Sequence, residues 1–435
     1  MYHILQIKNR KYIYFPFSQS FFFYTEELEK KLIGNNVSNC DLNKVINNEI
    51  HIEKKVLEVL ESYNQGEHTI GSCEINILHA CNMNCRYCFA SGGDHGKRGG
   101  MSKDNIEKIF EFIFQNTSKE KIGITIVGGE PFLDFKTFRE VVQYGKFQSK
   151  LVGQKVYFST ISNGINIDNV ISEFVQNERL NLIVSLDSNK KEINDYLRPT
   201  RSGISSFEYI MEHLLFLRDI NGFNVNVTIT PFNLNISEIA RFLFDELNAN
   251  NIHFGEVASD EAKMVFTDEQ ISKLMEEYDS LADIIIKKYK EGKYVRCYPL
   301  TPLDKIHKGI PTIKSCSALK NRCAFSPEGK IYPCDVMMYD EYCIGSIENG
   351  FDEKRISDLR EINIDDTWCH NCWARYLCGG ECLSIKVWKN YEQRALRCKL
   401  KKHICKLKLY IYENIAGTIN NTEKLNRIFE YSAKE

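Results

Sequence analysis

Three cysteines with the spacing of a metal site stand in one short segment, Cys81-Asn-Met-Asn-Cys85-Arg-Tyr-Cys88, directly after an apolar run at 75–78. Three thiolates on one tight loop can bind three irons of a 4Fe-4S cube and leave the fourth iron without a protein ligand. That iron can coordinate another molecule, so the loop predicts a site for chemistry. The alternatives are a zinc site or reduced buried thiols. Zinc loops usually add a second Cys-x2-Cys pair, however, and nothing nearby supplies a fourth ligand.

This segment has aromatic Tyr87 before its third cysteine and Phe89 after it, and it resembles the signature of radical S-adenosylmethionine (SAM) enzymes. The resemblance implies that Cys81, Cys85 and Cys88 hold a 4Fe-4S cluster whose open iron is chelated by the amino and carboxylate groups of SAM. It also implies that an electron from the cluster cleaves SAM. The released 5′-deoxyadenosyl radical then abstracts a hydrogen from the substrate.

A glycine pair lies about 40 residues after the three-cysteine loop, in Gly128-Gly129-Glu130-Pro131. Taken alone, this tetrapeptide is an ordinary turn in which two glycines allow a ligand to approach the backbone closely. At this distance from the loop it is similar to the family's GGEP motif, which holds the SAM amino group. The resemblance therefore assigns Gly128, Gly129 and Glu130 to SAM binding.

Three further motifs resemble the rest of a SAM pocket: Ser162-Asn163, Ser185-Leu186-Asp187 and the segment that ends at Arg198. By this resemblance the Ser185 hydroxyl reaches the SAM ribose or carboxylate. Arg198 pairs with the carboxylate, which suits the two parallel donors of a guanidinium. The alternative for Arg198 is a solvated helix end. Val257 is expected, by position alone, to pack on adenine.

A second group of cysteines occupies the C-terminal third of the chain. It resembles the SPASM domain, which follows the barrel in peptide- and protein-modifying radical SAM enzymes, and the alternative is a pair of zinc ribbons. The resemblance implies two auxiliary 4Fe-4S clusters and hence three clusters in all. The ligands of the first are Cys369, Cys372, Cys378 and Cys398. The ligands of the second are Cys316, Cys334 and Cys382, with Cys323 as the expected fourth.

The fourth ligand decides what the second auxiliary cluster can do. If Cys323 binds, the cluster is closed and suited to electron transfer. If Cys323 is packed away, an iron stays open and can ligate a substrate thiolate. The five remaining cysteines are expected to be packed thiols: Cys40, Cys73, Cys297, Cys343 and Cys405.

Asp335 directly follows Cys334. Sulfatase-maturing members of the family carry an Asp at this place as the general base, so the resemblance assigns Asp335 that catalytic role. A base must reach the substrate and release its proton easily. The equal alternative is a turn-forming Asp that accepts backbone hydrogen bonds.

Composition excludes several classes of protein. The net charge is −2 and the charged fraction is 26%, so nothing indicates a nucleic-acid partner or a membrane surface. We see no signal-peptide core and no apolar run long enough to span a bilayer. Sixteen cysteines without a secretion signal favour metal ligation in a reducing cytoplasm over a disulfide framework.

The elements that must position these residues alternate between strand and helix. Strands are predicted at 74–78, 122–127, 155–161, 182–186, 223–229 and 252–257. Helices are predicted at 102–115, 135–147, 166–176, 206–220 and 237–247. Successive βα units imply a parallel sheet with helices outside, which fits the α/β partial (β/α)6 TIM barrel that the resemblance implies. Such barrels keep their chemistry at the carboxyl ends of the strands.

We predict four domains. Residues 1–70 have apolar stretches at 2–7, 11–15 and 21–24 followed by helical segments at 45–46 and 51–62, an order that resembles a small winged-helix-like α+β domain for leader-peptide recognition. Such a domain would bind the leader as an added edge strand, and the alternative is a cap over the barrel. Residues 71–262 form the barrel, 263–312 a bridging helical region, and 313–435 the SPASM domain with a closing helix.

The leading hypothesis is an enzyme that installs an oxidative cross-link in a ribosomally made precursor peptide. A Cys-derived thioether is the first choice and a carbon–carbon bond the second. The partners would be the precursor with its leader and a reducing donor of the flavodoxin or ferredoxin type. One alternative is an anaerobic sulfatase maturase that oxidises Cys or Ser to formylglycine. Another is a non-catalytic Fe-S electron carrier.

Overall fold

The computed structural model describes residues 2–33, 40–63, 66, 68–217, 224–259, 261–364, 368–387 and 391–416. Residues 218–220 of the predicted helix 206–220, residue 223 of the predicted strand 223–229, the Cys40 side chain and the chain beyond 416 lie outside this description. Of the helices in the described ranges, none combines the length and the apolar character needed to cross a membrane.

An antiparallel sheet of β1 (His3–Ile7), β2 (Arg10–Phe15) and β3 (Ser20–Phe23) opens the chain, in the order β1-β2-β3. Two helices follow, α1 (Glu26–Ile33) and α2 (Cys40–Tyr63). The three predicted strands are confirmed. The two helical segments predicted at 45–46 and 51–62 are one continuous helix, and within the polar stretch between them Glu49 is buried and accepts the backbone N–H groups of Phe17 and Ser18 at 2.9 and 2.6 Å.

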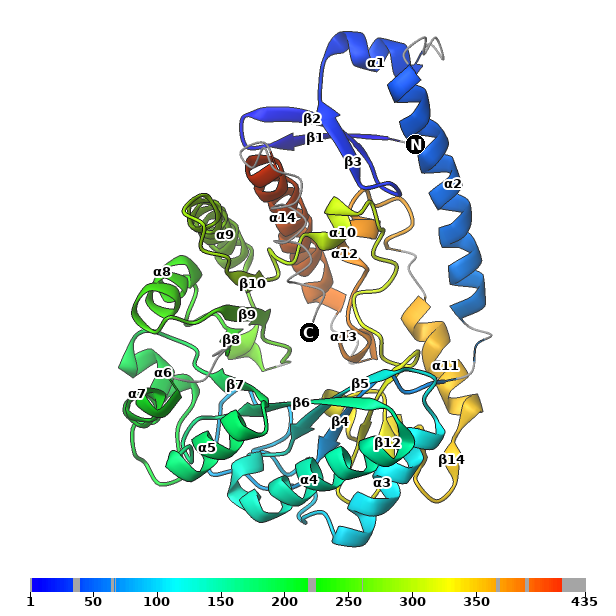
Figure 1. The fold of residues 1–435 in the computed structure, drawn as a ribbon. Helices are drawn as coiled ribbons and strands as arrows, with labels where there is room; N and C mark the ends of the chain where they lie inside the picture. Colours follow the sequence, from blue (N-terminus) through cyan, green and yellow to red (C-terminus); the bar gives the residue numbers. More distant parts are fainter. Residues whose placement is uncertain are drawn as a thin grey trace.

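The barrel matches the predicted alternation of strands and helices (Figure 1). Its six parallel strands are β4 (Ser72–Asn76), β5 (Lys121–Val127), β6 (Lys155–Ser162), β7 (Asn181–Ser185), β8 (Asn224–Ile229) and β9 (Asn251–Glu256). Its helices are α3 (Lys103–Gln115), α4 (Phe135–Val152), α5 (Asn169–Asn177), α6 (Lys191–Leu197), α7 (Ser206–Leu217) and α8 (Ile236–Arg241). The strands pair in chain order, so their carboxyl ends share one edge.

The sheet does not stop at six strands. β10 (Arg296–Tyr298) pairs in parallel with β9, and β11 (Arg322–Phe325) pairs in parallel with β4 at the other edge. From β11 the sheet continues antiparallel through β12 (Lys330–Tyr332), β13 (Gly345–Ser346) and β14 (Gly350–Phe351). The ranges predicted as bridge and SPASM domain therefore share one sheet with the barrel.

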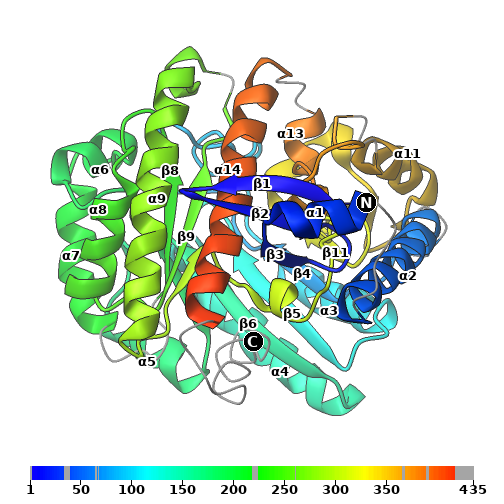
Figure 2. The same cartoon turned by 90° about the horizontal axis from the view of Figure 1, so that it is seen from above.

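The remaining helices are α9 (Asp268–Lys290), α10 (Asp304–His307), α11 (Glu353–Ile364), α12 (Arg375–Cys378), α13 (Leu383–Val387) and α14 (Tyr391–Ala416). Helix α9 begins at a capping box of Thr267 and Gln270 and lies beside α14 (Figure 2). The N-terminal sheet lies across α14 in the same view, and the Tyr12 hydroxyl donates to Glu413 of α14 at 2.6 Å. It is thus fixed to the C-terminal part of the chain.

Candidate active site

The three-cysteine loop follows β4 and is held against the segment after α6. The N–H groups of Asn84 and Arg86 donate to the carbonyls of Pro199 and Leu197 at 2.8 and 3.0 Å. The Cys81 sulfur accepts the N–H of Met83 at 3.4 Å and the amide of Asn163 at 3.8 Å. Donors of this kind stabilise a thiolate and therefore fit a cluster ligand.

Burial raises the pKa of Cys85 to about 12, although Arg198 counteracts it. A thiol in such a place stays protonated unless a metal takes the proton's position. In the part of the chain that the structure describes, no three His, Cys, Asp or Glu side chains gather closely enough for one metal ion. Binding of a cluster by Cys81, Cys85 and Cys88 stays a prediction, which the donors at Cys81 support.

The glycine pair at the end of β5 touches this loop. The Gly129 N–H donates to the Leu78 carbonyl at 2.8 Å, and the Glu130 N–H donates to the Ala80 carbonyl at 2.9 Å. A Cβ on Gly129 would lie 2.1 Å from the Ala80 carbonyl oxygen, and one on Gly128 would lie 2.9 Å from the Leu78 carbonyl oxygen. The loop and the predicted SAM motif thus approach as closely as only glycine permits.

Glu130 joins the ends of β5 and β6. Its carboxylate is buried and accepts the N–H of Phe132 at 3.1 Å, the Ser162 hydroxyl at 2.9 Å and the N–H of Asn163 at 2.7 Å. Burial raises the pKa of Glu130 to about 7 and outweighs these hydrogen bonds, which lower it. A cation such as an amino group would relieve that penalty, so the site fits the predicted ligand.

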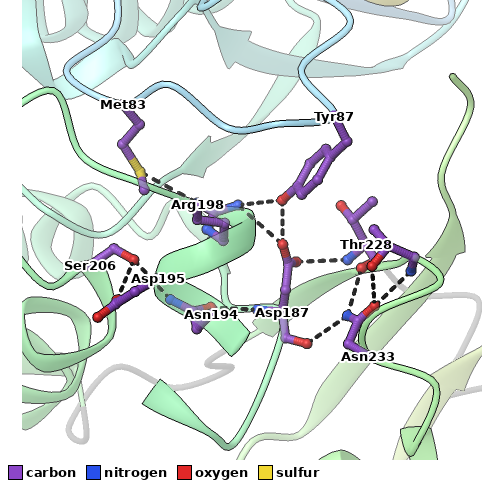
Figure 3. Close-up of polar contacts among 10 residues, drawn as sticks. Met83, Tyr87, Asp187, Asn194, Asp195, Arg198, Ser206, Thr228 and Asn233 are labelled. Atoms are coloured by element: carbon purple, nitrogen blue, oxygen red, sulfur yellow. Dashed lines mark hydrogen bonds and ion pairs between the residues drawn. The ribbon is translucent and has the colours of Figure 1, made fainter. Parts of the chain in front are cut away.

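A buried network fastens the cysteine loop to the end of β7 (Figure 3). The Tyr87 hydroxyl donates to the Asp187 carboxylate, and Arg198 Nη1 donates to the Tyr87 hydroxyl at 2.9 Å. Asp187 also accepts the Thr228 N–H at 2.8 Å, and its own N–H donates to Asn194 at 3.0 Å. Burial raises the pKa of Asp187, and Arg198 partly offsets this rise.

Arg198 contacts other residues of this network. Its guanidinium lies 4.0 Å from Asp187 and donates to Tyr87, while its Nε is buried without a hydrogen-bond partner in the described chain. Arg198 is therefore a link between the loop and the sheet, and contact with a SAM carboxylate stays a prediction. Ser185 ends β7 and Val257 follows β9, so both lie on the predicted edge of the sheet.

The outer set, as we call Cys369, Cys372, Cys378 and Cys398, lines a single pocket. This is the ligand group predicted from the sequence, brought together from a turn, α12 and α14. The sequence did not reveal the neighbour of this set: Cys405 is buried about two helical turns beyond Cys398 on α14, and its thiol hydrogen-bonds with that of Cys378. Cys73 and Cys297 are buried as expected, and Cys343 is half-buried.

The inner set, as we call Cys316, Cys334 and Cys382, lies beside β4 and β11. Cys382 is close enough to interact electrostatically with both other thiols. Two residues that sequence reasoning missed share this place: the buried Glu74 of β4 and the half-buried Arg322 of β11 form an ion pair, which interacts with Cys316 and Cys334. The sequence signal was a carboxylate inside a predicted strand.

The structure places Cys323 away from the inner set, against the expected ligation. Successive side chains of a strand point to opposite faces. Arg322 turns toward Glu74, so Cys323 turns to the other face, where it is fully buried in the apolar core and pairs across the sheet with Cys73. A ligand on that face cannot join Cys316, Cys334 and Cys382.

Asp335 is half-buried next to the inner set, and its backbone N–H donates to Glu74 at 2.9 Å. Burial, with the Glu74 charge beside it, raises the pKa of Asp335 to about 8. The carboxyl therefore holds its proton at neutral pH in this state of the protein. Its role as general base stays a prediction.

Residues 75–245 match the model of the radical SAM superfamily. The chain is 25% identical over 395 residues to radical SAM cyclopropyl synthase TigE of Paramaledivibacter caminithermalis, with 80% of this chain and 78% of the relative covered. It is 27% identical over 329 residues to a cysteine-type anaerobic sulfatase-maturating enzyme of Clostridium novyi, with 69% and 84% covered.

Two solved structures share the fold. Native anSMEcpe with bound AdoMet aligns with a TM-score of 0.68 at 19% identity, over 80% of this chain and all of that one (100%). Streptococcus suis SuiB bound to S-adenosylmethionine aligns with a TM-score of 0.55 at 13% identity, over 90% and 96%. The predicted partial barrel is confirmed, and the enzyme relatives decide against a non-catalytic electron carrier. Residues 75–245 form a domain of the radical SAM superfamily, and this match together with the enzyme relatives indicates that the chain is an enzyme.

Proposed function

We propose that this enzyme matures a ribosomally made precursor peptide by an oxidative cross-link, first of all a Cys-derived thioether. The observation that carries the proposal is the combination on one chain of the Cys81 loop against Glu130 with two further cysteine sets. Bound SAM and its cluster would supply a 5′-deoxyadenosyl radical that takes a hydrogen atom from the peptide. The chain's own residues would bind and orient SAM and the peptide, and they would shield the radical from water.

Each group of residues has a defined task in this proposal. Cys81, Cys85 and Cys88 hold the SAM-binding cluster, and Glu130 offers its carboxylate to the SAM amino group. Ser162 and Asn163 fix the orientation of that carboxylate through the hydrogen bonds at 2.9 and 2.7 Å. The inner and outer sets hold the two auxiliary clusters.

The thioether is favoured by the position of Cys323. With that thiol packed into the core, the inner set offers three cysteine ligands and leaves room for a soft ligand from outside, such as a peptide thiolate. Forming the bond removes one hydrogen atom from carbon, which the 5′-deoxyadenosyl radical would take up, one proton from sulfur, which would go to solvent, and one electron, which an auxiliary cluster would accept. The product is then two mass units lighter than the precursor.

The leader of the precursor would bind at β3, which is an edge strand of the N-terminal sheet. Phe22 and Phe23 on this strand are 38% and 55% exposed, so the edge offers both free backbone groups and apolar contacts. SuiB, which shares the fold, has been solved bound to its precursor peptide SuiA. A reducing carrier of the flavodoxin or ferredoxin type would supply electrons.

Two other outcomes have specific support. Ring or carbon–carbon bond formation is favoured by the relative described as a cyclopropyl synthase. Formylglycine formation is favoured by the sulfatase-maturating relative and by Asp335 beside the inner set. The N-terminal sheet counts against the latter, because a sulfatase maturase needs no leader-binding edge.

The test is an anaerobic incubation of reconstituted enzyme with SAM, a reductant and candidate precursor peptides, followed by mass spectrometry. We expect a loss of two mass units and, after alkylation, one fewer free thiol for a thioether. A loss of two units with all thiols free would indicate a carbon–carbon bond or formylglycine made from Ser, and only formylglycine carries an aldehyde that a hydrazide can label. The triple variant Cys81→Ala, Cys85→Ala, Cys88→Ala should make no 5′-deoxyadenosine; if it does, the assignment of the loop fails.

A further inference from the structure

The two C-terminal cysteine sets lie in opposite electrostatic surroundings, which is a feature that the proposed reaction does not by itself require. Both sets consist of thiols on short loops and helix ends. The charged side chains around them differ in sign and in number.

Around the inner set the charges are balanced. The Arg322 guanidinium is the one cation that we find interacting with Cys316 and Cys334 in the described chain. It faces the buried Glu74 carboxylate as an ion pair. The backbone N–H of Asp335 donates to the same Glu74, and the raised pKa of the Asp335 carboxyl keeps it from adding a second full negative charge. One cation therefore faces one carboxylate.

Around the outer set cations prevail. Glu381 is buried and pairs with two arginines, Arg394 at 3.4 Å and Arg397 at 2.7 Å. Two lysines add to these arginines: Lys401 and Lys402 line the pocket together with the four cysteines.

Lys401 is the most closely placed of these cations. It is half-buried, and its ammonium interacts with Cys378, Glu256 and Glu381. Among the described residues, positive groups outnumber negative ones around the outer set even with Glu256 counted. The Cys405 thiol adds a hydrogen bond at Cys378. The surrounding stretch of α14 from Arg394 to Lys408 contains no Asp or Glu.

Reduction of an iron–sulfur cluster adds one negative charge. Nearby cations and hydrogen bonds to the sulfurs stabilise the reduced state, whereas nearby carboxylates destabilise it, and net charge is among the factors that set the potential. Burial enlarges these effects because the surrounding medium screens charges poorly.

We propose that these charges order the two auxiliary potentials, so that a cluster on the outer set is easier to reduce than one on the inner set. The inference rests on the proposed function insofar as both sets must hold clusters. Lys401 is then a positioning residue that raises the potential of the outer-set cluster. Glu74 is a positioning residue that lowers the potential of the inner-set cluster. An electron would move downhill from the barrel side toward the pocket on α14.

The test is a redox titration followed by electron paramagnetic resonance on full-length reconstituted protein. The Cys81→Ala, Cys85→Ala, Cys88→Ala background removes the first cluster, and Cys316→Ala with Cys334→Ala, or Cys372→Ala with Cys378→Ala, leaves one auxiliary set each. We expect the higher midpoint potential in the protein that retains the outer set. An equal or reversed order would overturn the inference.

Charge variants separate local from global effects. Lys401→Met should lower the potential of the outer-set cluster only, and Glu74→Gln should raise that of the inner-set cluster only. Lys401→Arg should restore the original value, because it keeps the charge. Lys288→Met is the matched control: Lys288 is a buried lysine paired with Asp245 at 2.5 Å, and it is absent from the surroundings of both sets.

Iron content measured for every variant keeps the two hypotheses apart. If the C-terminal sets bind no iron, the proposed function fails together with the inference. If both clusters form but Lys401→Met and Glu74→Gln leave their potentials unmoved, or move the wrong one, the inference alone fails.

Discussion

Gly129 lies where the end of β5 meets the three-cysteine loop, and there its missing side chain matters. In Gly129→Ala the new Cβ would stand 2.1 Å from the Ala80 carbonyl oxygen and 2.9 Å from the Cys81 nitrogen. Both obstacles are backbone atoms, so the loop must shift. Because about 1.4 kcal/mol already corresponds to a tenfold rate change, we expect at least a tenfold loss of 5′-deoxyadenosine formation.

The control for this variant is a glycine within β5 itself. A Cβ on Gly123 would meet its nearest neighbour, the Ser72 Cβ, at an ordinary 3.7 Å. Gly123→Ala should therefore keep both iron content and activity. If the two alanine variants behave alike, close approach at Gly129 is not what the site requires.

Glu130 should make the stability of the SAM-free protein depend on pH. Its pKa is about 7 when folded, against 4.5 as the ordinary value, so the folded state binds more protons between these limits. The free energy of unfolding contributed by this group therefore falls as pH rises from about 4.5 to 7, by roughly 3 kcal/mol in total. Urea unfolding at pH 5 and 7.5 should show this loss, and Glu130→Gln should remove it. An identical pH slope in both proteins would contradict the pKa.

At the scale of elements, the order of the barrel strands followed from the sequence, because each apolar run is bounded by polar turns and separated by a helix-length segment. The sequence did not predict β10 and β11. They have three and four residues, and they are strands only because β9 and β4 offer free edges. The side on which Cys323 lies depends on the same pairing. The spacing of the cysteines could not have shown whether Cys323 is a cluster ligand or a thiol packed in the core.

The outer set shows the opposite case. Its four cysteines line one pocket, and only the resemblance had put them in one group, because spacing alone leaves the grouping open; their binding of a cluster stays a prediction. The sequence did not predict roles for Glu74, Arg322 and Lys401, because each of them interacts with a partner that is far away in the chain. Charged residues of this kind look like ordinary surface residues until the fold is known.

Strand β3 should bind the leader through its backbone, which a proline can test. The Tyr24 N–H donates to the Lys11 carbonyl at 2.9 Å, so by alternation the Phe23 N–H points away from β2. Phe23→Pro would remove that outward donor without breaking the sheet. We expect Phe23→Pro to weaken binding of a leader peptide by about tenfold more than Phe23→Ala, which loses only the ring. Isothermal titration calorimetry measures both. Equal affinities would mean that the sheet is only a cap.

At the scale of the whole molecule, the barrel and the C-terminal region cannot be separate bodies, because one sheet runs through both. Residues Ser72 to Ile75 of β4 pair with Arg322 to Phe325 of β11, and α9 packs along α14. Removing residues 313–435 would open the edge of a buried strand and leave the Glu74 carboxylate without Arg322. An open apolar strand edge invites pairing between chains.

We therefore expect residues 1–312, expressed alone, to aggregate, and sedimentation of the lysate should place most of the fragment in the pellet. Coexpression with residues 313–435 should return part of it to solution, because the missing strand can then pair with β4. The unrelated variant Lys288→Met in the full-length chain controls for simple loss of stability. A fragment 1–312 that is monomeric and unfolds cooperatively would show that β4 needs no partner. The auxiliary sets would then have to be regarded as an appended domain, free to move relative to the SAM site.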